Sequence, residues 1–239
     1  MPEEERFDVG LLVFPNLTQL DMTGPYEVFC RMPGAKVHLI APTLDPQPSE
    51  HGLPIQPTTT YAACPRLDAL VVPGGFGVNA LLNDDETLEF VREKAEGAAY
   101  LGSVCTGSLV LGAAGLLVGK RATSHWMSRD LLAELGAEPV AERVVVDGRI
   151  MTGGGITAGI DFALRMVEAI RGRAVAEEIQ LAMEYDPSPP FGAGSPASAD
   201  PGTVDALREK WAPYQDDRRR LVREAAAKLK ASTETNRDS

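Results

Sequence analysis

The sequence predicts a single α/β domain in which a mostly parallel sheet is doubly wound, with helices on both of its faces. Short apolar runs of strand length alternate along the chain with stretches of helical length, which is the pattern of βαβ units. The composition is globular, since hydrophobic residues make up 44% and charged residues 24% of the 239 residues. A chain of this length can bury one large core.

The first half of the chain is predicted to form four strands and the helices that connect them. Residues 7–14 are a continuous apolar run that ends at Pro15, as expected of a buried strand. The segment 83–97 opens with acidic residues, which favour the positive end of a helix dipole. The predicted order is strand 7–14, loop and helix 17–32, strand 37–41, strand 67–72, helix 83–97, strand 100–104 and helix 109–117.

The second half is predicted to complete the domain and to add a tail. Between residues 187 and 201 the composition shifts to Pro, Ser, Gly and Ala, which indicates an arm or a linker. Residues 203–230 return to a helical pattern, and an amphipathic helix must bury its face on this domain or on a second subunit. We therefore divide the chain into a catalytic domain, 1–186, and an arm with a C-terminal helix, 187–239. The elements expected before the arm are strand 121–124, helix 128–135, strands 143–146 and 150–152, and helices 156–171 and 174–183.

Charge and hydropathy exclude several classes of partner. The formal net charge of -11 repels phosphate backbones and anionic lipid, so we expect neither nucleic acid nor a membrane as partner. The basic run Arg218, Arg219, Arg220 is flanked by acidic residues. The acidic N-terminus does not resemble a secretory signal, and no apolar run approaches the roughly 20 residues that span a bilayer. We expect a cytoplasmic location.

The three cysteines have to be interpreted one by one. Their odd number and wide spacing provide neither a disulfide framework nor a Cys-x-x-Cys metal site, and we expect no metal. Cys30, on an apolar helix, and Cys64, in a loop before a proline, are expected to be small packed side chains. Cys105 differs, because it stands where a strand feeds directly into a helix, a placement that nucleophiles use.

Three segments are expected to meet at the carboxyl ends of the strands, where doubly wound sheets bind ligands. They carry Asp21, Gly74 with Gly75, and Cys105 with Thr106. A cysteine at the start of a helix faces unpaired N–H groups and the positive end of the dipole, which favour the thiolate. The glycines allow the backbone to approach a ligand closely, so the amides of Gly75 and Thr106 are candidates to bind a developing negative charge.

Asp21 is the candidate proton carrier for Cys105. An ionised carboxylate would repel a thiolate, so the useful state is a protonated carboxyl that hydrogen-bonds the sulfur, with one proton shared by the pair. Two alternatives stay open: Asp21 as a helix N-cap, and Thr106 as helix-start chemistry alone. The run 153–155 of three glycines has no dinucleotide or Walker pattern around it, and no cofactor is expected from it.

The histidines narrow the reaction type. A class I glutaminase needs a histidine well after its cysteine, and none follows His125. A protease of the related Cys-His type needs a histidine directly after the nucleophile, where this chain has Thr106. His125 is a candidate for the rim of the pocket, and a structural imidazole beside Trp126 is the alternative.

The residues around Cys105 resemble a known superfamily. The elbow 104–107, the loop 73–75 and Asp21 are similar to the PfpI-like superfamily, which shares the class I glutamine amidotransferase-like fold. Longer segments look more narrowly like its isonitrile hydratase branch, over about residues 7–200, and the last of them is the most specific. These segments are LDMTGPYEVF (20–29), ATSHW (122–126), GGGITAGID (153–161) and MEYDPSPPF (183–191).

The resemblance implies a flavodoxin-like arrangement and a cofactor-free homodimer that hydrates isonitriles to N-substituted formamides. On that basis Cys105 attacks the terminal isonitrile carbon, Asp21 supplies a proton and later activates water, and a thioimidate forms in between. Thr106 is expected to hydrogen-bond near the reacting carbon or the water. Gly74, Gly75 and His125 are the expected substrate-binding residues.

Two other functions stay open at the level of the sequence. The same segments resemble the sensor domain of AraC-type regulators, but only 53 residues follow Asp186, whereas two helix-turn-helix units need roughly 100. A stand-alone sensor is not excluded. The second alternative is an enzyme of the Parkinson-disease-protein type that acts on glyoxal-like aldehydes or senses oxidants through its cysteine. That branch carries a glutamate where this chain has the shorter Asp21.

Overall fold

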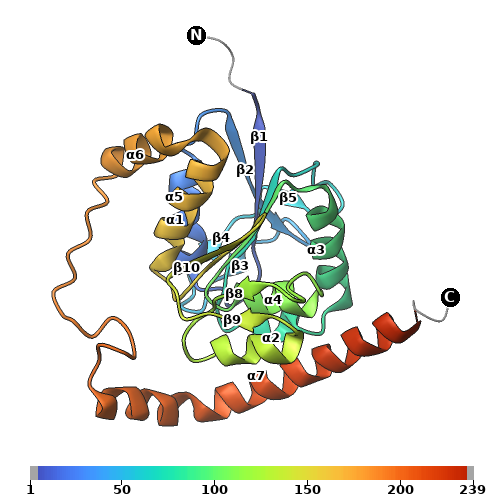
Figure 1. Cartoon of the computed structure of the whole chain (residues 1–239). Coiled ribbons are helices and arrows are strands. Elements are labelled where there is room, and N and C mark those ends of the chain that lie inside the picture. The colour runs from blue at the N-terminus through green and yellow to red at the C-terminus, as the bar shows by residue number, and fades with distance from the viewer. Residues whose placement is uncertain (1–4, 236–239) are drawn as a thin grey trace.

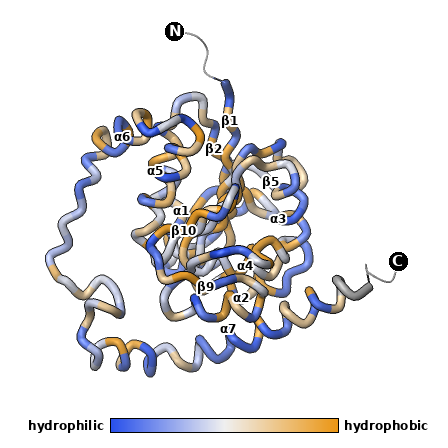
Figure 2. The backbone as a smooth tube through the Cα atoms, in the orientation of Figure 1, coloured by the Kyte–Doolittle hydropathy of each residue, from blue (hydrophilic) through white to orange (hydrophobic). Residues whose placement is uncertain are grey.

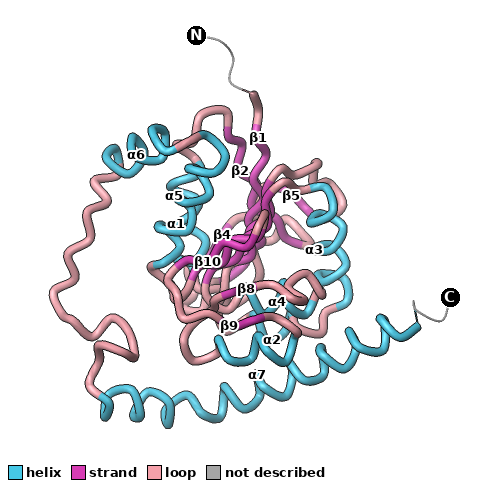
Figure 3. The backbone as a smooth tube through the Cα atoms, viewed as in Figure 1, coloured by secondary structure: helices cyan, strands magenta, loops and turns pink. Residues whose placement is uncertain are grey.

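A seven-stranded sheet forms the centre of the protein (Figures 1 and 3), and the computed structural model describes residues 5–235, with side chains described as far as residue 231. Every neighbouring pair of its strands is parallel except one pair at an edge, β10 with β11. The predicted mostly parallel α/β fold is confirmed. The spatial order is β10 (Val144–Asp147), β11 (Ile150–Gly153), β7 (Tyr100–Val104), β6 (Ala69–Val72), β1 (Phe7–Leu12), β2 (Ala35–Ala41) and β5 (Thr59–Thr60).

Helices cover both faces of the sheet, which explains why its central strands are continuous apolar runs. All four residues of β6 are buried, as are Leu11 and Leu12 of β1. Figure 1 places α1, α5 and α6 on one side of the sheet, and α2, α3 and α4 on the other. Their bounds are α1 (Gln19–Phe29), α2 (Val78–Leu81), α3 (Asp85–Gly97), α4 (Gly107–Ala113), α5 (Ala158–Arg171) and α6 (Arg173–Ala182).

The strand order reverses at β1, and this reversal positions the site. The chain goes from β1 to β2 on one side and then crosses to β6 on the other side of β1, from where it continues outward to β7. Loops that leave neighbouring strands in opposite directions open a crevice at the carboxyl end of the sheet. The segments after β1, β6 and β7 therefore meet there.

Several predicted elements differ from the structure in bounds or type. The segment 121–124 contributes only β8 (Arg121–Ala122), which pairs with β9 (Glu138–Pro139) outside the main sheet. The helix predicted at 128–135 is a 3-10 helix, η1 (Arg129–Leu135), and the helix predicted at 109–117 is α4, which begins and ends earlier. The sequence did not predict α2, β5, β9 or the pair β3 (Gln47–Pro48) and β4 (Pro54–Ile55), which are too short to show a periodic pattern.

A long C-terminal helix, α7 (Pro201–Thr235), runs across the carboxyl-end side of the body, as Figures 1 and 2 show. It contacts η1, α4 and α2, and its side chains Val222 and Ala225 are buried against them. The segment between α6 and α7 is exposed through most of its length and is separated from the body in the view of Figure 1. The helix thus packs on the domain of its own chain.

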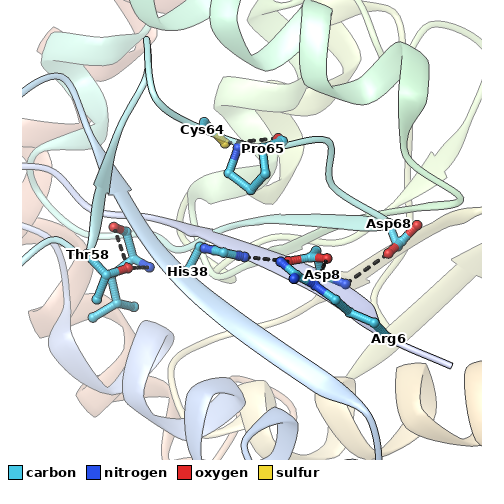
Figure 4. A network of polar contacts seen from close by, with 8 residues as sticks. Arg6, Asp8, His38, Thr58, Cys64, Pro65 and Asp68 are labelled. Carbon is cyan, nitrogen blue, oxygen red and sulfur yellow. Dashed lines mark hydrogen bonds and ion pairs between the residues drawn. The ribbon is translucent and has the colours of Figure 1, made fainter. Parts of the chain in front are cut away.

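A polar network ties β1 to β2 at the end of the sheet opposite the crevice (Figure 4). The carboxylate of Asp8 accepts hydrogen bonds from Arg6 at 2.7 Å and lies 2.6 Å from Nε2 of His38. Asp68 accepts a hydrogen bond from the Asp8 amide. His38 therefore has a structural partner, which accounts for a histidine inside a strand.

Two of the cysteines lie away from the crevice. Cys64 is buried, as predicted, and its thiol faces the Pro65 carbonyl (Figure 4). The prediction that Cys30 is packed was wrong, because it caps the C-terminus of α1 with its side chain exposed. Among residues 5–235 no helix combines the length and the apolar character needed to cross a bilayer, and no cluster of metal-ligating side chains occurs.

Candidate active site

Cys105 occupies a sharp turn between β7 and α4. Its φ of 55° is a left-handed backbone conformation that non-glycine residues rarely adopt. The turn is held by bonds from its amide to the carbonyls of Gly153 and Gly154, at 3.0 and 2.8 Å, and by Ser124, whose hydroxyl donates to its carbonyl at 2.9 Å. Backbone strain of this kind, about 1–3 kcal/mol, persists where surrounding structure imposes it, and it is frequent at active sites.

Small residues let the three loops come together. A Cβ at Gly107 would lie 2.0 Å from the carbonyl oxygen of Val72, so only glycine allows α4 to start directly above β6. A Cβ at Gly74 would lie 2.5 Å from the Thr106 amide and 2.8 Å from both Asp21 and Cys105. The segments predicted to meet at the crevice do meet, with Gly74 at their centre.

Asp21 lies in the first turn of α1 and is completely buried. Its Oδ2 accepts a hydrogen bond from the Gly74 amide at 3.0 Å, and its carboxyl is within hydrogen-bonding reach of the Cys105 side chain. Its Oδ1 is buried and has no hydrogen-bond partner among the described residues. Asp21 therefore faces the sulfur and does not cap the helix.

Burial dominates the electrostatics of this pair. It raises the pKa of Asp21 to about 7, against the lowering effect of the hydrogen bonds from Cys105 and Gly74. Burial, followed by the charge of Asp21, raises the pKa of the Cys105 thiol well above its ordinary value. Because the charge of either group disfavours ionisation of the other, the two do not ionise together, and the pair keeps at least one proton at neutral pH.

The expectation that the start of a helix favours the Cys105 thiolate needs correction. Cys105 is only 5% exposed, and it precedes α4 by two residues. The groups that favour its thiolate are the amides of Thr106 and Ile156 and the positive charge of Arg218. A thiolate here is stabilised by specific donors, since burial outweighs any effect of the short helix.

The two glycine amides are not free donors. The Gly74 amide bonds to Asp21, and the Gly75 amide donates to the hydroxyl oxygen of Thr106 at 3.1 Å. The partner of the Gly75 amide is Thr106, which is itself buried, and the binding of a developing charge by Gly75 stays a prediction. The glycines shape the site, while the amides directed at the sulfur belong to Thr106 and Ile156.

Cys105 lines a pocket of about 330 Å³ whose wall includes the aromatic rings of Phe76, Trp126, Trp211 and Tyr214. Phe76 follows β6, whereas Trp211 and Tyr214 come from α7; their ring centroids lie 5.3 and 4.7 Å from that of Phe76. The larger groove, of about 650 Å³, lies between β10, α5 and α6, and its lining includes neither Cys105 nor Asp21. The pocket at Cys105 suits a small, mainly apolar ligand.

His125 lines the same pocket, and its ring lies 5.8 Å from that of Trp126. Burial, reinforced by the charge of Arg218, lowers the pKa of His125 to about 4, so the imidazole is neutral at physiological pH. Both roles considered for it are compatible with this position: it is at the rim of the pocket and beside the tryptophan.

Sequence reasoning missed Arg218, which is 3% exposed and lines the pocket. Its position along the C-terminal helix could have revealed it from the sequence. Trp211, Tyr214, Arg218, Val222 and Ala225 follow one another at intervals of three or four residues, so they share the face of α7 that packs on the domain. Arg219 and Arg220 lie on the other face and are exposed.

Comparisons with known proteins identify relatives of this chain. The family model described as the DJ-1/PfpI family matches residues 8–169. The chain is 53% identical to isonitrile hydratase of Pseudomonas putida over 221 residues, covering 92% of this chain and 97% of that protein. It is 45% identical to a THiJ/PfpI family protein from Pseudomonas syringae, whose crystal structure superposes with a TM-score of 0.90 over 92% of each chain. A glutathione-independent glyoxalase of Caenorhabditis elegans, DJR-1.2, is 30% identical over 44% of this chain and 56% of its own length.

Proposed function

This chain belongs to the DJ-1/PfpI family, and we propose that it is an enzyme, an isonitrile hydratase, that adds water to an isonitrile and releases an N-substituted formamide. Three lines support this proposal: the 53% identity over almost the full length of the Pseudomonas putida enzyme, the buried Cys105–Asp21 pair, and the small aromatic pocket that adjoins it. The buried pair carries most weight, because Cys105 offers a nucleophile and Asp21 an acid to the same carbon, the terminal carbon of the isonitrile.

In the first step the Cys105 thiolate attacks the terminal carbon of the isonitrile, and a C–S bond forms. The electron pair that develops on this carbon takes the proton held by Asp21, so a thioimidate and a carboxylate result. The buried Oδ1 of Asp21, which has no hydrogen-bond partner in the described chain, is the oxygen suited to hold that proton.

In the second step a water molecule adds to the thioimidate carbon, one of its protons ends on the nitrogen, and the Asp21 carboxylate accepts the other. The C–S bond then breaks, the formamide leaves, and the thiolate with its protonated carboxyl is restored. Thr106 would hydrogen-bond near the reacting carbon or the water, and neutral His125 would border the substrate. These steps require only the isonitrile, water and groups of this chain.

We further propose that the protein is a homodimer in the cytoplasm. Two large apolar side chains, Leu181 and Phe191, are 82% and 80% exposed, and a second subunit would cover surface of this kind. All three cysteines are free, and Cys105 must be reduced to act, which suits a reducing compartment. The acidic net charge makes nucleic acid and anionic membranes poor partners.

The test is formamide production from a small apolar isonitrile by wild type, Cys105→Ala and Asp21→Asn, followed by chromatography. We expect Cys105→Ala to lose turnover completely and Asp21→Asn to lose at least about a hundredfold, the usual contribution of a general acid. Intact mass of wild type mixed with the isonitrile should show the thioimidate adduct at low pH. Turnover by Cys105→Ala would refute the mechanism.

Glyoxal consumption, measured in the same samples, separates this activity from that of the glyoxalase-type relatives. We expect isonitrile hydration to exceed glyoxal consumption. A protein that binds isonitriles without forming formamide would instead be a ligand sensor.

A further inference from the structure

Arg218 is a buried cation with no ion-pairing partner among the described residues. Its side chain comes from α7 and is 3% exposed, yet no carboxylate oxygen of the described chain lies within 4 Å of its guanidinium. Burying a charge without a counter-ion costs several kcal/mol. A cation kept at such a cost indicates that negative charge develops beside it.

Four hydrogen bonds to neutral acceptors fix the guanidinium in place. Nε donates to the side-chain oxygen of Asn79 at 2.7 Å, and Nη1 donates to the hydroxyl of Ser128 at 3.0 Å. Nη2 donates to the Tyr214 hydroxyl at 2.7 Å and to the carbonyl of Gly75 at 3.0 Å. Because these acceptors lie on three other segments and on α7 itself, the position of the charge is fixed by the whole fold.

The contact with Gly75 connects Arg218 to the nucleophile. The amide of Gly75 donates to Thr106, whose own amide faces the sulfur of Cys105. Arg218 and Cys105 also line the same pocket. The guanidinium therefore both supports the loop next to the nucleophile and places a positive charge near the sulfur.

The other charges around the pair act in the same direction. Glu50, whose hydrogen bond from Thr18 places it at the pocket wall, repels a carboxylate at Asp21. Arg218 attracts a thiolate at Cys105. The remaining titratable groups that line this pocket are His51, His125 and Tyr214. The backbone hydrogen bonds also favour a negative charge on the sulfur. The Asp21 carboxyl accepts one backbone hydrogen bond, from Gly74, whereas the sulfur faces the amides of Thr106 and Ile156.

We propose that Arg218 is a positioning residue of the active site, whose buried guanidinium stabilises the Cys105 thiolate and so favours transfer of the shared proton from the sulfur to Asp21. The proton moves from Sγ to Oδ1 of Asp21, and no other bond changes. This inference deepens the proposed function and rests on the same pair. It also gives α7 a role in catalysis, because the C-terminal helix carries a charge that the active site needs.

The experiment measures the rate at which iodoacetamide alkylates Cys105 as a function of pH, followed by intact mass after the other two cysteines are replaced by serine. Removing the charge in Arg218→Met should raise the midpoint of this profile by about one unit, the lower end of the effect of a neighbouring charge. Alkylation below the midpoint should then be about tenfold slower. Arg219→Met, which removes the same charge from the exposed face of α7, should leave the profile unchanged.

Two further variants keep the test decisive. Arg218→Gln replaces the charged side chain by a neutral polar one and should shift the midpoint as Arg218→Met does. Arg218→Lys keeps the charge, so its midpoint should stay within about half a unit of wild type. A wild-type midpoint in a folded Arg218→Met or Arg218→Gln overturns the proposal, as does a full shift in Arg218→Lys. Since alkylation needs no isonitrile, this result is independent of whether the proposed hydratase activity is found.

Discussion

Two residues of this protein are individually unfavourable where they stand. Cys105 has a left-handed backbone conformation, and Asp21 is a carboxyl with no exposure to solvent. Each costs stability, the first through strain and the second through desolvation. Active sites often retain such costs because the same features supply reactivity. Replacing the unfavourable group should therefore stabilise the fold while it removes activity.

The first prediction concerns the free energy of unfolding of Asp21→Asn. Since the folded-state pKa of Asp21 is about 7, against an ordinary 3.8, its stabilising effect is complete below about pH 4 and is lost as the pH rises to about 7. Asparagine has no such loss. Asp21→Asn should match wild type in urea unfolding at low pH and exceed it by about 4 kcal/mol at pH 8.

The control for this prediction is Asp130→Asn, which removes an exposed carboxylate. Its stability relative to wild type should not vary with pH over this range. If Asp21→Asn were less stable than wild type at pH 8, the carboxyl would be a net stabilising group there, contrary to the effect of its burial.

At the scale of elements, the junction of β7 and α4 creates the site. A strand that continues directly into a helix needs a sharp turn. This turn places the buried Cys105 in the lining of the pocket, while its backbone is bonded to the end of β11 and the residue after it. The helix can start there only because Gly107 lies against the backbone of β6. The glycine two residues after Cys105 is therefore required by packing and not only by the chemistry of the site.

The second prediction tests this packing with a pair of glycine substitutions. Gly107→Ala would place a methyl group 2.0 Å from the Val72 carbonyl, so we expect a loss of about 3 kcal/mol in the free energy of unfolding and a displaced Cys105. Gly97→Ala, at the end of α3, meets no atom within 4 Å and should be neutral or slightly stabilising. Urea unfolding measures both, and equal stability of the two variants would contradict the packing argument.

At the scale of the whole molecule, the C-terminal helix completes the site that the sheet begins. The loops after β1, β6 and β7 supply the reacting groups, whereas α7 supplies Trp211, Tyr214 and Arg218 to the pocket wall. The segment before α7 is exposed, and Phe191 within it projects from the body. The helix that follows residue 186 packs on the preceding part of the chain, and the pocket uses residues of both.

The third prediction concerns assembly. If a second subunit covers the exposed apolar side chains, light scattering coupled to gel filtration should give twice the chain mass of 25.6 kDa. Replacing Leu181 and Phe191 together by serine should then weaken the dimer and leave the fold intact, because neither side chain contributes to the core. A mass of 25.6 kDa for wild type at micromolar concentration would exclude the proposed homodimer.

The sequence by itself determined the fold class, the strands at 100–104 and 67–72, and the choice of Cys105 and Asp21 as partners. These features are local or periodic: buried parallel strands are continuous apolar runs, and strand-to-loop junctions mark the carboxyl edge of the sheet. The tertiary structure decided the environment of those residues. Burial raises the pKa values of Asp21 and Cys105, and the hydroxyl of Thr106 accepts the hydrogen bond of the Gly75 amide. Arg218 entered the site from a helix more than one hundred residues away, because packing of α7 on the domain, rather than any local motif, brings its guanidinium to the nucleophile.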